Sequence, residues 1–479
     1  MSSQNGVGIL LGDQRKAIIA LAIPLGVALL IQQINSLVDS LWVSGLGSDH
    51  MAAVGIVSPI YAAVVGIGSG LGIGISAAIS RYIGKGEPSS ANRIAAQGLI
   101  LTVAVSVILT IVLFIAAEPL LILFGAGDTI ALCMEYAIPL YIGTIFIVLS
   151  GVMSGMLRGE GAAKRSMYIQ TAGALVNIAL DPVLIYTFGM GVSGAALATV
   201  IALAISSIIP FYWYAIKKDT FVGIERRYFV SDKSARSDIL AVGFPEMLEL
   251  SLMSLFNVIL NYFVIVCGGT DAVAIYTTAW KVIILGLVPA QAIGGALVSV
   301  CSAEYGMRRF DAIKDAFRYS VRISVTSMFI IALSIIALSG PIATVFTLGE
   351  GTIHLRSDLQ ELFVIMAFLL PGFSLVFTGS SLMQALRRAG QAMTNTVFRN
   401  ILIAVLFAFA TYAIADIQWV WYMLVIGEIT GGVMMWAHAR TVLKDTLRRE
   451  GKRIGDETRV KGVKTINDVD ATQPSEASS

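Results

Sequence analysis

Charged side chains are scarce in this chain of 479 residues. Asp, Glu, Lys and Arg make up 13% of it, apolar residues make up 56%, and the mean hydropathy is +0.81. A soluble domain carries about 25% charged residues, so this composition argues against a soluble enzyme and for a protein that lies in a lipid bilayer. The net charge of +2 gives no reason to expect a nucleic acid as a partner.

Cysteine and histidine are also rare. The three cysteines lie far apart in apolar stretches, which predicts neither a disulfide framework nor a metal cluster. The three histidines are dispersed, which argues against a zinc or haem site, and no nucleophile and base converge in the sequence. We therefore expect a protein that is no enzyme and needs no cofactor. These residues are Cys133, Cys267, Cys301, His50, His354 and His438.

Long apolar stretches are abundant. Twelve windows of about twenty apolar residues recur, each bounded by charged residues, glycine or proline. Such unalternating stretches must be helices, because in hydrocarbon only helices or closed barrels satisfy every backbone hydrogen bond. The sequence therefore predicts an all-α membrane protein with twelve transmembrane helices. The predicted spans are 17–44, 51–80, 94–117, 130–157, 167–188, 193–216, 237–266, 273–303, 316–339, 357–386, 394–415 and 418–441.

The positive charges predict the orientation of these helices. Lys and Arg gather at the termini and in the loops after even-numbered spans, and Lys281 is the basic residue that we place inside a span. Loops rich in Lys and Arg stay on the cytoplasmic side. We therefore expect a multi-pass protein of the cell membrane with both termini in the cytoplasm.

An internal repeat divides the chain into halves. A shift of 222 residues superimposes Gly84 on Gly306, and a shift of 229 superimposes residues 157–161 on 386–390. This repeat predicts two pseudo-symmetric six-helix lobes in parallel orientation, an arrangement common in transporters. The predicted parts are an N-terminal lobe (1–216), a cytoplasmic linker (217–236), a C-terminal lobe (237–441) and a disordered cytoplasmic tail (442–479).

The first span contains polar residues on one helical face. Gln32, Asn35, Ser36 and Asp39 are spaced by three and four residues, which aligns them along a helix. A carboxylate within the bilayer costs roughly 2.5–3.5 kcal/mol, so an acid in such a place indicates a functional site.

The fifth span supplies a second carboxylate. Asn177 and Asp181 lie four residues apart on one face, at a depth in the span similar to that of Asp39. Thr199, early in the sixth span, lies at the same depth. Two carboxylates in one low-dielectric pocket cannot both stay ionised unpaired, so either one takes a proton or a cation such as Na+ bridges them. The alternative is two separately satisfied acids that only hold helices together.

Three motifs resemble those of the multidrug and toxic compound extrusion (MATE) transporters, and most closely their DinF-like branch in archaea and bacteria. The motifs are SLVDSLWVSGLG in the first span, LRGEG after the fourth and NIALDP in the fifth. The resemblance implies a cation-driven exporter of two six-helix lobes around a central cavity. It also implies that Asp39, Asn177, Asp181 and Thr199 respond to the coupling cation. Some relatives have Tyr where this chain has Asn35, which puts that part of the polar network in doubt.

The second half keeps the amides of the first but lacks its acids. Under the shift of 222, Asn35 falls on Asn257 and Asp39 on Asn261; under the shift of 229, Asp181 falls on Ala410. We therefore expect ion coupling to reside in the first lobe. The residues that we expect to contact the substrate are Gln32, Asn35, Glu249, Asn257 and Asn261.

Further charges and prolines occur inside the spans. Lys281 and Glu428 either form an intramembrane ion pair that locks helices or contribute to substrate binding. Pro24 and Pro245 lie at matching places in the two halves and are candidate hinges, because a proline frees a backbone carbonyl within a helix.

Glycines at alternate positions from Gly66 to Gly74 superficially resemble a nucleotide-binding fingerprint. No strand precedes them, so we interpret them as residues for close helix packing. Nothing resembles an ATP-binding cassette either, which points to an ion gradient or the substrate's own gradient as the energy source.

The predicted function is a secondary antiporter. It would export amphipathic, cationic organic compounds in exchange for H+ or Na+ by alternating access, and it would act as a monomer. The alternative is a flippase for a lipid-linked precursor or another amphiphile.

Overall fold

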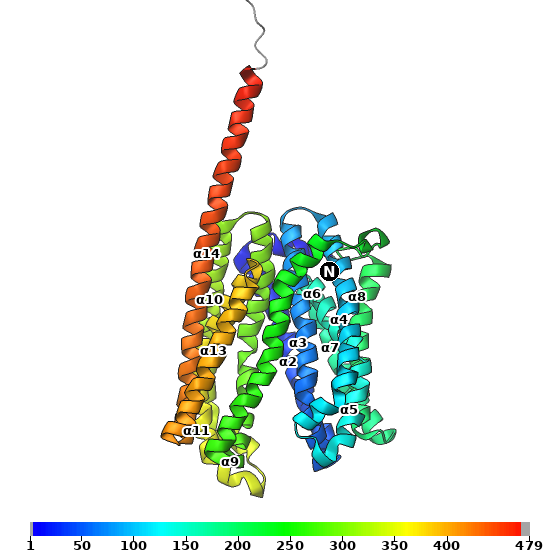
Figure 1. Ribbon diagram of the computed structural model, residues 1–479, viewed down its shortest axis with the longest axis vertical. Coiled ribbons are helices and arrows are strands. Elements are labelled where there is room, and N and C mark those ends of the chain that lie inside the picture. Colours follow the sequence, from blue (N-terminus) through cyan, green and yellow to red (C-terminus); the bar gives the residue numbers. More distant parts are fainter. Residues whose placement is uncertain (1–2, 471–479) are drawn as a thin grey trace, which may run out of the picture.

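The computed structural model describes residues 3–470, and this part of the chain is a bundle of long helices without strands (Figure 1). The helices are α1 (Ser3–Leu10), α2 (Gln14–Ser44), α3 (Ser48–Gly84), α4 (Pro88–Leu123), α5 (Ile130–Ile142), α6 (Thr144–Gly159), α7 (Ala163–Pro182), α8 (Gly191–Tyr212), α9 (Lys233–Gly306), α10 (Phe310–Phe346), α11 (Arg356–Ala367), α12 (Leu369–Ala385), α13 (Ala389–Phe409) and α14 (Ile417–Asp470). Short π-helical turns, Val183–Thr187, Trp213–Lys217 and Ala410–Ile414, extend α7, α8 and α13.

The twelve predicted spans are confirmed within the described residues. Nine continuous helices are long and apolar enough to cross a membrane, and two bent helix pairs add one span each. One of the nine is the 74-residue helix α9, which contains two spans and so brings the total to twelve. Gly269 separates the two, because its φ of 71°, which only glycine adopts easily, interrupts the helix there.

The two bends fall at matching places in the halves. The axes of α5 and α6 differ by 51° and those of α11 and α12 by 41°. The sequence predicts one straight span for each pair, so the bends are a difference from that prediction. Gly143 allows the first bend, since a side chain at this position would collide with Val200 of α8.

The structure corrects the second repeat shift from 229 to 226 residues, the separation between the first residues of α7 and α13. The counterparts of Asn177 and Asp181 are then Ile403 and Phe407. Both are fully buried apolar residues. The second lobe therefore still lacks these acids, as predicted.

The lobes pack against each other near the end of the bundle that carries both termini, which we call the terminal end (Figure 1). Here α3 crosses α9 backbone to backbone: Gly84 lies against Ala303, and Gly306 lies against Arg81. The shift of 222 relates both partners of one contact to those of the other. The predicted repeat is thus an approximate two-fold axis at this crossing.

Polar contacts hold the same end of the lobes together. Asp238 of α9 accepts a hydrogen bond from Tyr82 (2.8 Å) and forms an ion pair with Arg81 (3.3 Å), both from α3. Arg15 of α2 pairs with Asp315 of α10 at 2.7 Å. Among the described residues, the hydrogen bonds and ion pairs that join the lobes all lie in this half of the bundle.

The linker between the lobes is attached to the first lobe. The carboxylate of Glu160, just after α6, accepts hydrogen bonds from the backbone N–H groups of Phe221 and Val222, both at 3.1 Å. Asn92 of α4 accepts another from Gly223 at 2.8 Å. Burial raises the pKa of Glu160 to about 7, although these hydrogen bonds favour its ionised form.

Two predictions about the C-terminal part are wrong. The tail after residue 441 was expected to be disordered, but α14 continues to Asp470, and no proline interrupts this stretch. Lys281 is not the only basic residue inside a span, because Arg399 lies ten residues after the start of α13. The remaining residues, 471–479, lie outside the described part.

Candidate functional site

Helices α2 and α7 bring three of the four predicted coupling residues together. The cap of α2, in which the Asp13 side chain accepts a hydrogen bond from Lys16 N–H, starts a continuous helix that carries Asp39. The turn at Gly161, with φ of 78°, precedes α7, which carries Asn177 and Asp181.

A chain of hydrogen bonds connects the two helices. The side-chain amide of Asn35 donates to Asn177 Oδ1 at 2.7 Å and to Asp39 Oδ2 at 3.2 Å. The amide of Asn177 donates to Asp181 Oδ1 at 3.1 Å. Asn35 was predicted to bind substrate, but here it bridges the two acid-bearing helices. Asn35 thus lies at the centre of the polar network whose hydrogen bonds the sequence did not predict.

The two carboxyl groups meet in this network. Those of Asp39 and Asp181 lie close enough for a hydrogen bond between them, and Asp181 is only 1% exposed. Three buried oxygens have no partner: Asn35 Oδ1, Asp39 Oδ1 and Asp181 Oδ2. Such a group of free acceptors fits either one shared proton or a small cation such as Na+, for which oxygen ligands are suited.

Thr199 does not join this group through its hydroxyl. Its Oγ1 donates to the carbonyl of Ala195 in its own helix, α8, at 3.1 Å. Its part in coupling therefore stays a prediction.

Two tyrosines near the pair were missed by the sequence analysis. Tyr61 of α3 interacts electrostatically with Asp39, and Tyr136 of α5 interacts with both Asp39 and Asp181. Aromatic residues within long apolar spans give no distinctive spacing, so only the three-dimensional packing reveals them.

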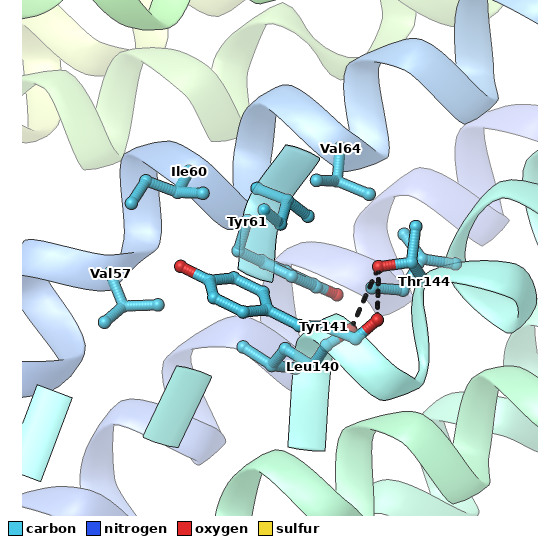
Figure 2. A pocket seen from close by; sticks show the side chains of 9 residues that line it. Val57, Ile60, Tyr61, Val64, Leu140, Tyr141 and Thr144 are labelled. Atoms are coloured by element: carbon cyan, nitrogen blue, oxygen red, sulfur yellow. Dashed lines mark hydrogen bonds between the residues drawn. The ribbon is translucent and has the colours of Figure 1, made fainter. Parts of the chain in front are cut away.

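Tyr61 also borders a small, mainly apolar cavity inside the first lobe (Figure 2). At its edge Thr144 donates a hydrogen bond to the carbonyl of Tyr141 at 2.8 Å, next to the bend between α5 and α6. The cavity lies among α3, α4, α5 and α6 and not between the lobes. Its walls carry no charge, so it offers no place for an ionic substrate. Its lining consists of Val57, Ile60, Tyr61, Val64, Leu113, Leu140, Tyr141, Thr144 and Ile147.

Glu246 and Glu249 of the second lobe have partners on other helices, whereas the amides that donate to Asp39 and Asp181 lie on the same helices as these acids. Glu246 accepts a hydrogen bond from Gln384, and Glu249 accepts one from Thr396 at 2.8 Å. Glu249 was predicted to contact substrate; its hydrogen bond turns it toward α13.

The predicted ion pair between Lys281 and Glu428 is not formed. Glu428 pairs instead with Arg399 at 3.5 Å, and both side chains are 6% exposed. The ion pair of Glu428 with Arg399 was not predicted, because Arg399 was not recognised as a charge within the eleventh span. Lys281 is exposed on α9.

The other predicted substrate residues lie on α2 and α9. Gln32 is exposed, and Asn257 and Asn261 are half-buried, with Oδ1 of Asn261 buried and unpartnered. Pro24 and Pro245 lie inside these same two helices. Substrate contact and hinge motion stay predictions for all five.

Comparisons with known proteins agree with this architecture. The MatE family model matches residues 24–183 and 245–410. The multidrug export protein MepA of Staphylococcus aureus (strain NCTC 8325 / PS 47) is 24% identical over 409 residues, which cover 84% of this chain and 89% of MepA.

Solved structures are more similar in sequence. A MATE crystallised in complex with MaL6 is 33% identical and superimposes with a TM-score of 0.89. A MOP superfamily transporter from Pyrococcus furiosus Vc1 (DSM3638) is also 33% identical, with a TM-score of 0.88. Each alignment covers 92% of this chain and 98% of the other. Helices, repeat and matches together show that the chain belongs to the MatE family of multidrug export transporters.

Proposed function

We propose that this antiporter exports amphipathic organic cations in exchange for H+ or Na+, and that the ion binds at Asp39 and Asp181. The observation that carries this proposal is the cluster of unpartnered buried oxygens shared by these two residues and Asn35. Free carboxylate oxygens within the bilayer are costly unless an ion satisfies them, so the site should gain and lose one during transport.

The coupling follows from the position of the cluster between two helices. Asp39 lies on α2, which also contacts α9 of the second lobe, and Asp181 lies on α7 inside the first lobe. An ion that draws the two carboxyl groups together changes how α2 packs. Such a change alters the face that α2 presents to the second lobe, and with it the affinity for substrate.

We further propose that the terminal end faces the cytoplasm of the cell, as the positive-inside rule requires, and that the transporter acts as a monomer. Because the lobes are joined at that end, the described state would be closed toward the cytoplasm and open outward. Alternating access would then break the contacts of Asp238 and Asp315 and form new ones at the opposite end.

Efflux of a fluorescent organic cation from proteoliposomes tests the proposal. With an imposed proton or sodium gradient, Asp39→Asn and Asp181→Asn should each abolish gradient-driven efflux. Asp49→Asn, which changes an exposed carboxylate at the start of α3, should leave it unchanged. Normal transport by both site variants would refute the assignment. Replacing sodium by potassium at fixed pH identifies the coupling ion.

A further inference from the structure

Lys281 is an unpaired positive charge in the second membrane-spanning part of α9. It lies twelve residues after Gly269, where the helix is interrupted, and 25 residues before Gly306, where it ends. Its side chain is exposed, and within residues 3–470 it takes part in no hydrogen bond or ion pair. A charged residue at this depth normally faces a water-filled space or a partner. Lys281 has no such partner among the described residues, so the side of α9 on which it lies decides what it can bind.

The position of Lys281 on the helix turns it away from the interior of its own lobe. Gly286 faces that interior, since a side chain there would contact Leu370 and Ile331. A separation of five residues rotates Lys281 by about 140° from Gly286. Ala292, in contrast, is eleven residues away and therefore within about 20° of the face that carries Lys281. Ala292 lies against Gly26 of α2 in the first lobe. Lys281 thus lies on the side of α9 that meets the first lobe.

At the depth of Lys281 the facing sides of α2 and α9 carry exposed side chains. The contacts of α2 with this side of α9 include Leu25 against Gly295 and, closer to Lys281, Gly26 against Ala292. Gln32 and Ser36 continue the face of Leu25 beyond these contacts. Both of these residues are exposed, as are Lys281 and Thr277 on α9. Measured from the contact of Gly26 with Ala292, Ser36 lies about 15 Å and Lys281 about 17 Å further along their helices at 1.5 Å per residue. The facing side of α2 therefore carries neutral polar groups, and that of α9 carries an ammonium group.

Among the described residues, the intramembrane carboxylates of Asp39 and Glu428 already have other partners. Asp39 is engaged with Asn35 and Asp181, and Glu428 with Arg399. A purely cationic substrate would meet repulsion here, whereas a carboxylate would gain a charge-assisted hydrogen bond.

We propose that Lys281 binds the anionic group of the substrate in the space between the lobes. The transporter then prefers amphiphilic zwitterions, which combine a cationic aromatic part with a carboxylate, over the corresponding simple cations. This inference rests on the proposed export of amphiphiles and specifies their chemical class.

Two dyes that differ in one group test it. Rhodamine 6G is a cationic ester, and rhodamine 19 is the same molecule with a free carboxylate. Fluorescence anisotropy of the full-length protein in detergent should show that Lys281→Met weakens binding of rhodamine 19 about tenfold and changes binding of rhodamine 6G less than about twofold. Lys281→Arg should retain the wild-type preference, and Lys314→Met, at an exposed lysine near the start of α10, should leave both affinities unchanged.

Each result has a defined meaning. An equal effect of Lys281→Met on the two dyes, no effect on either, or a wild type that binds only rhodamine 6G would overturn the assignment of Lys281 and leave the export of cations intact. A wild type that binds neither dye would instead contradict the proposed function itself. Unchanged thermal unfolding of Lys281→Met would establish that a selective loss is not a folding defect.

Discussion

At the scale of single residues, the intramembrane acids of the two lobes differ in which helix supplies their partners. Glu246, Glu249 and Glu428 each have a partner within the second lobe. The donors to Asp39 and Asp181 lie on the same helices as these acids, and one oxygen of each acid is buried without a donor. Two such acids side by side, with no basic partner in the described part of the chain, can exchange an ion, whereas an acid paired with another helix holds the two helices together.

Asn35 holds this pair in place, and its removal should uncouple the site. Asn35→Ala removes the donor to Asn177 Oδ1 and to Asp39 Oδ2, which leaves buried acceptors unsatisfied at a cost of about 1–3 kcal/mol. We expect a lower unfolding temperature and a slower gradient-driven efflux. Ser40→Ala on the same helix, whose hydroxyl bonds only to the carbonyl of Ser36, is the matched control. If Asn35→Ala transports like the wild type, Asn35 does not position the pair.

The residues of the site were largely predictable from the sequence, but the hydrogen bonds between them were not. Asp39, Asn177 and Asp181 are visible because a charge in an apolar span is rare and because spacing by four residues places groups on one face. The link through Asn35 depends on how α2 and α7 rotate against each other, which no local pattern records. The same holds for the pairing of Glu428 with Arg399 instead of Lys281.

At the scale of elements, the linker acts as part of the first lobe. Glu160, Asn92 and Gln97 all accept hydrogen bonds from its backbone, and Arg93 pairs with Asp232 at the start of α9. Motion between the lobes must therefore be absorbed in α9 itself or at its first turn, and not in a loose connection.

The stability of this attachment should depend on pH through Glu160. Because burial raises its pKa in the folded protein to about 7, from 4.5, the folded state binds the proton more tightly than the unfolded chain. Its contribution to stability is complete below about pH 4.5 and is lost as the pH rises to about 7, a change of about 3 kcal/mol.

Thermal unfolding in detergent at pH 5 to 8 measures this effect. The unfolding temperature of the wild type should fall toward neutral pH more steeply than that of Glu160→Gln, in which no proton is exchanged. Glu118→Gln, at an exposed position near the end of α4, should keep the wild-type profile. Parallel pH profiles of the wild type and Glu160→Gln would contradict this role.

The existence and order of the twelve spans could be read from the sequence because the thickness of hydrocarbon fixes the length of each apolar stretch. The bends could not, since the angle between α5 and α6 depends on Val200 of a distant helix that packs against Gly143. The continuation of α14 beyond its apolar stretch could not be predicted, because a polar helix and a polar coil have similar compositions.

At the scale of the whole molecule, the lobes are closed against each other at the terminal end. Ser76 of α3 and Ser299 of α9 mark this closure inside the bundle, with hydroxyl oxygens 3.2 Å apart. A covalent bond at this place would prevent the lobes from separating there.

A disulfide between these positions should therefore block transport reversibly. We expect Ser76→Cys with Ser299→Cys, in a background with Cys133, Cys267 and Cys301 replaced by alanine, to lose efflux after oxidation and to regain it with a reductant. Each single cysteine variant should transport under both conditions. Full transport by the oxidised and cross-linked protein would show that this end need not open.

The glycines of α3 have a consequence for how easily the lobes part. Gly70 and Gly74 place the backbone of α3 directly on Met247 and Gly243 of α9. At these two positions backbone meets backbone, so few side-chain rotamers need to rearrange there when the helices separate. A single added methyl group at either glycine would collide with the backbone of α9 and push the two helices apart. It would favour the form that is open at the terminal end, and the transporter would then remain on one side of its cycle.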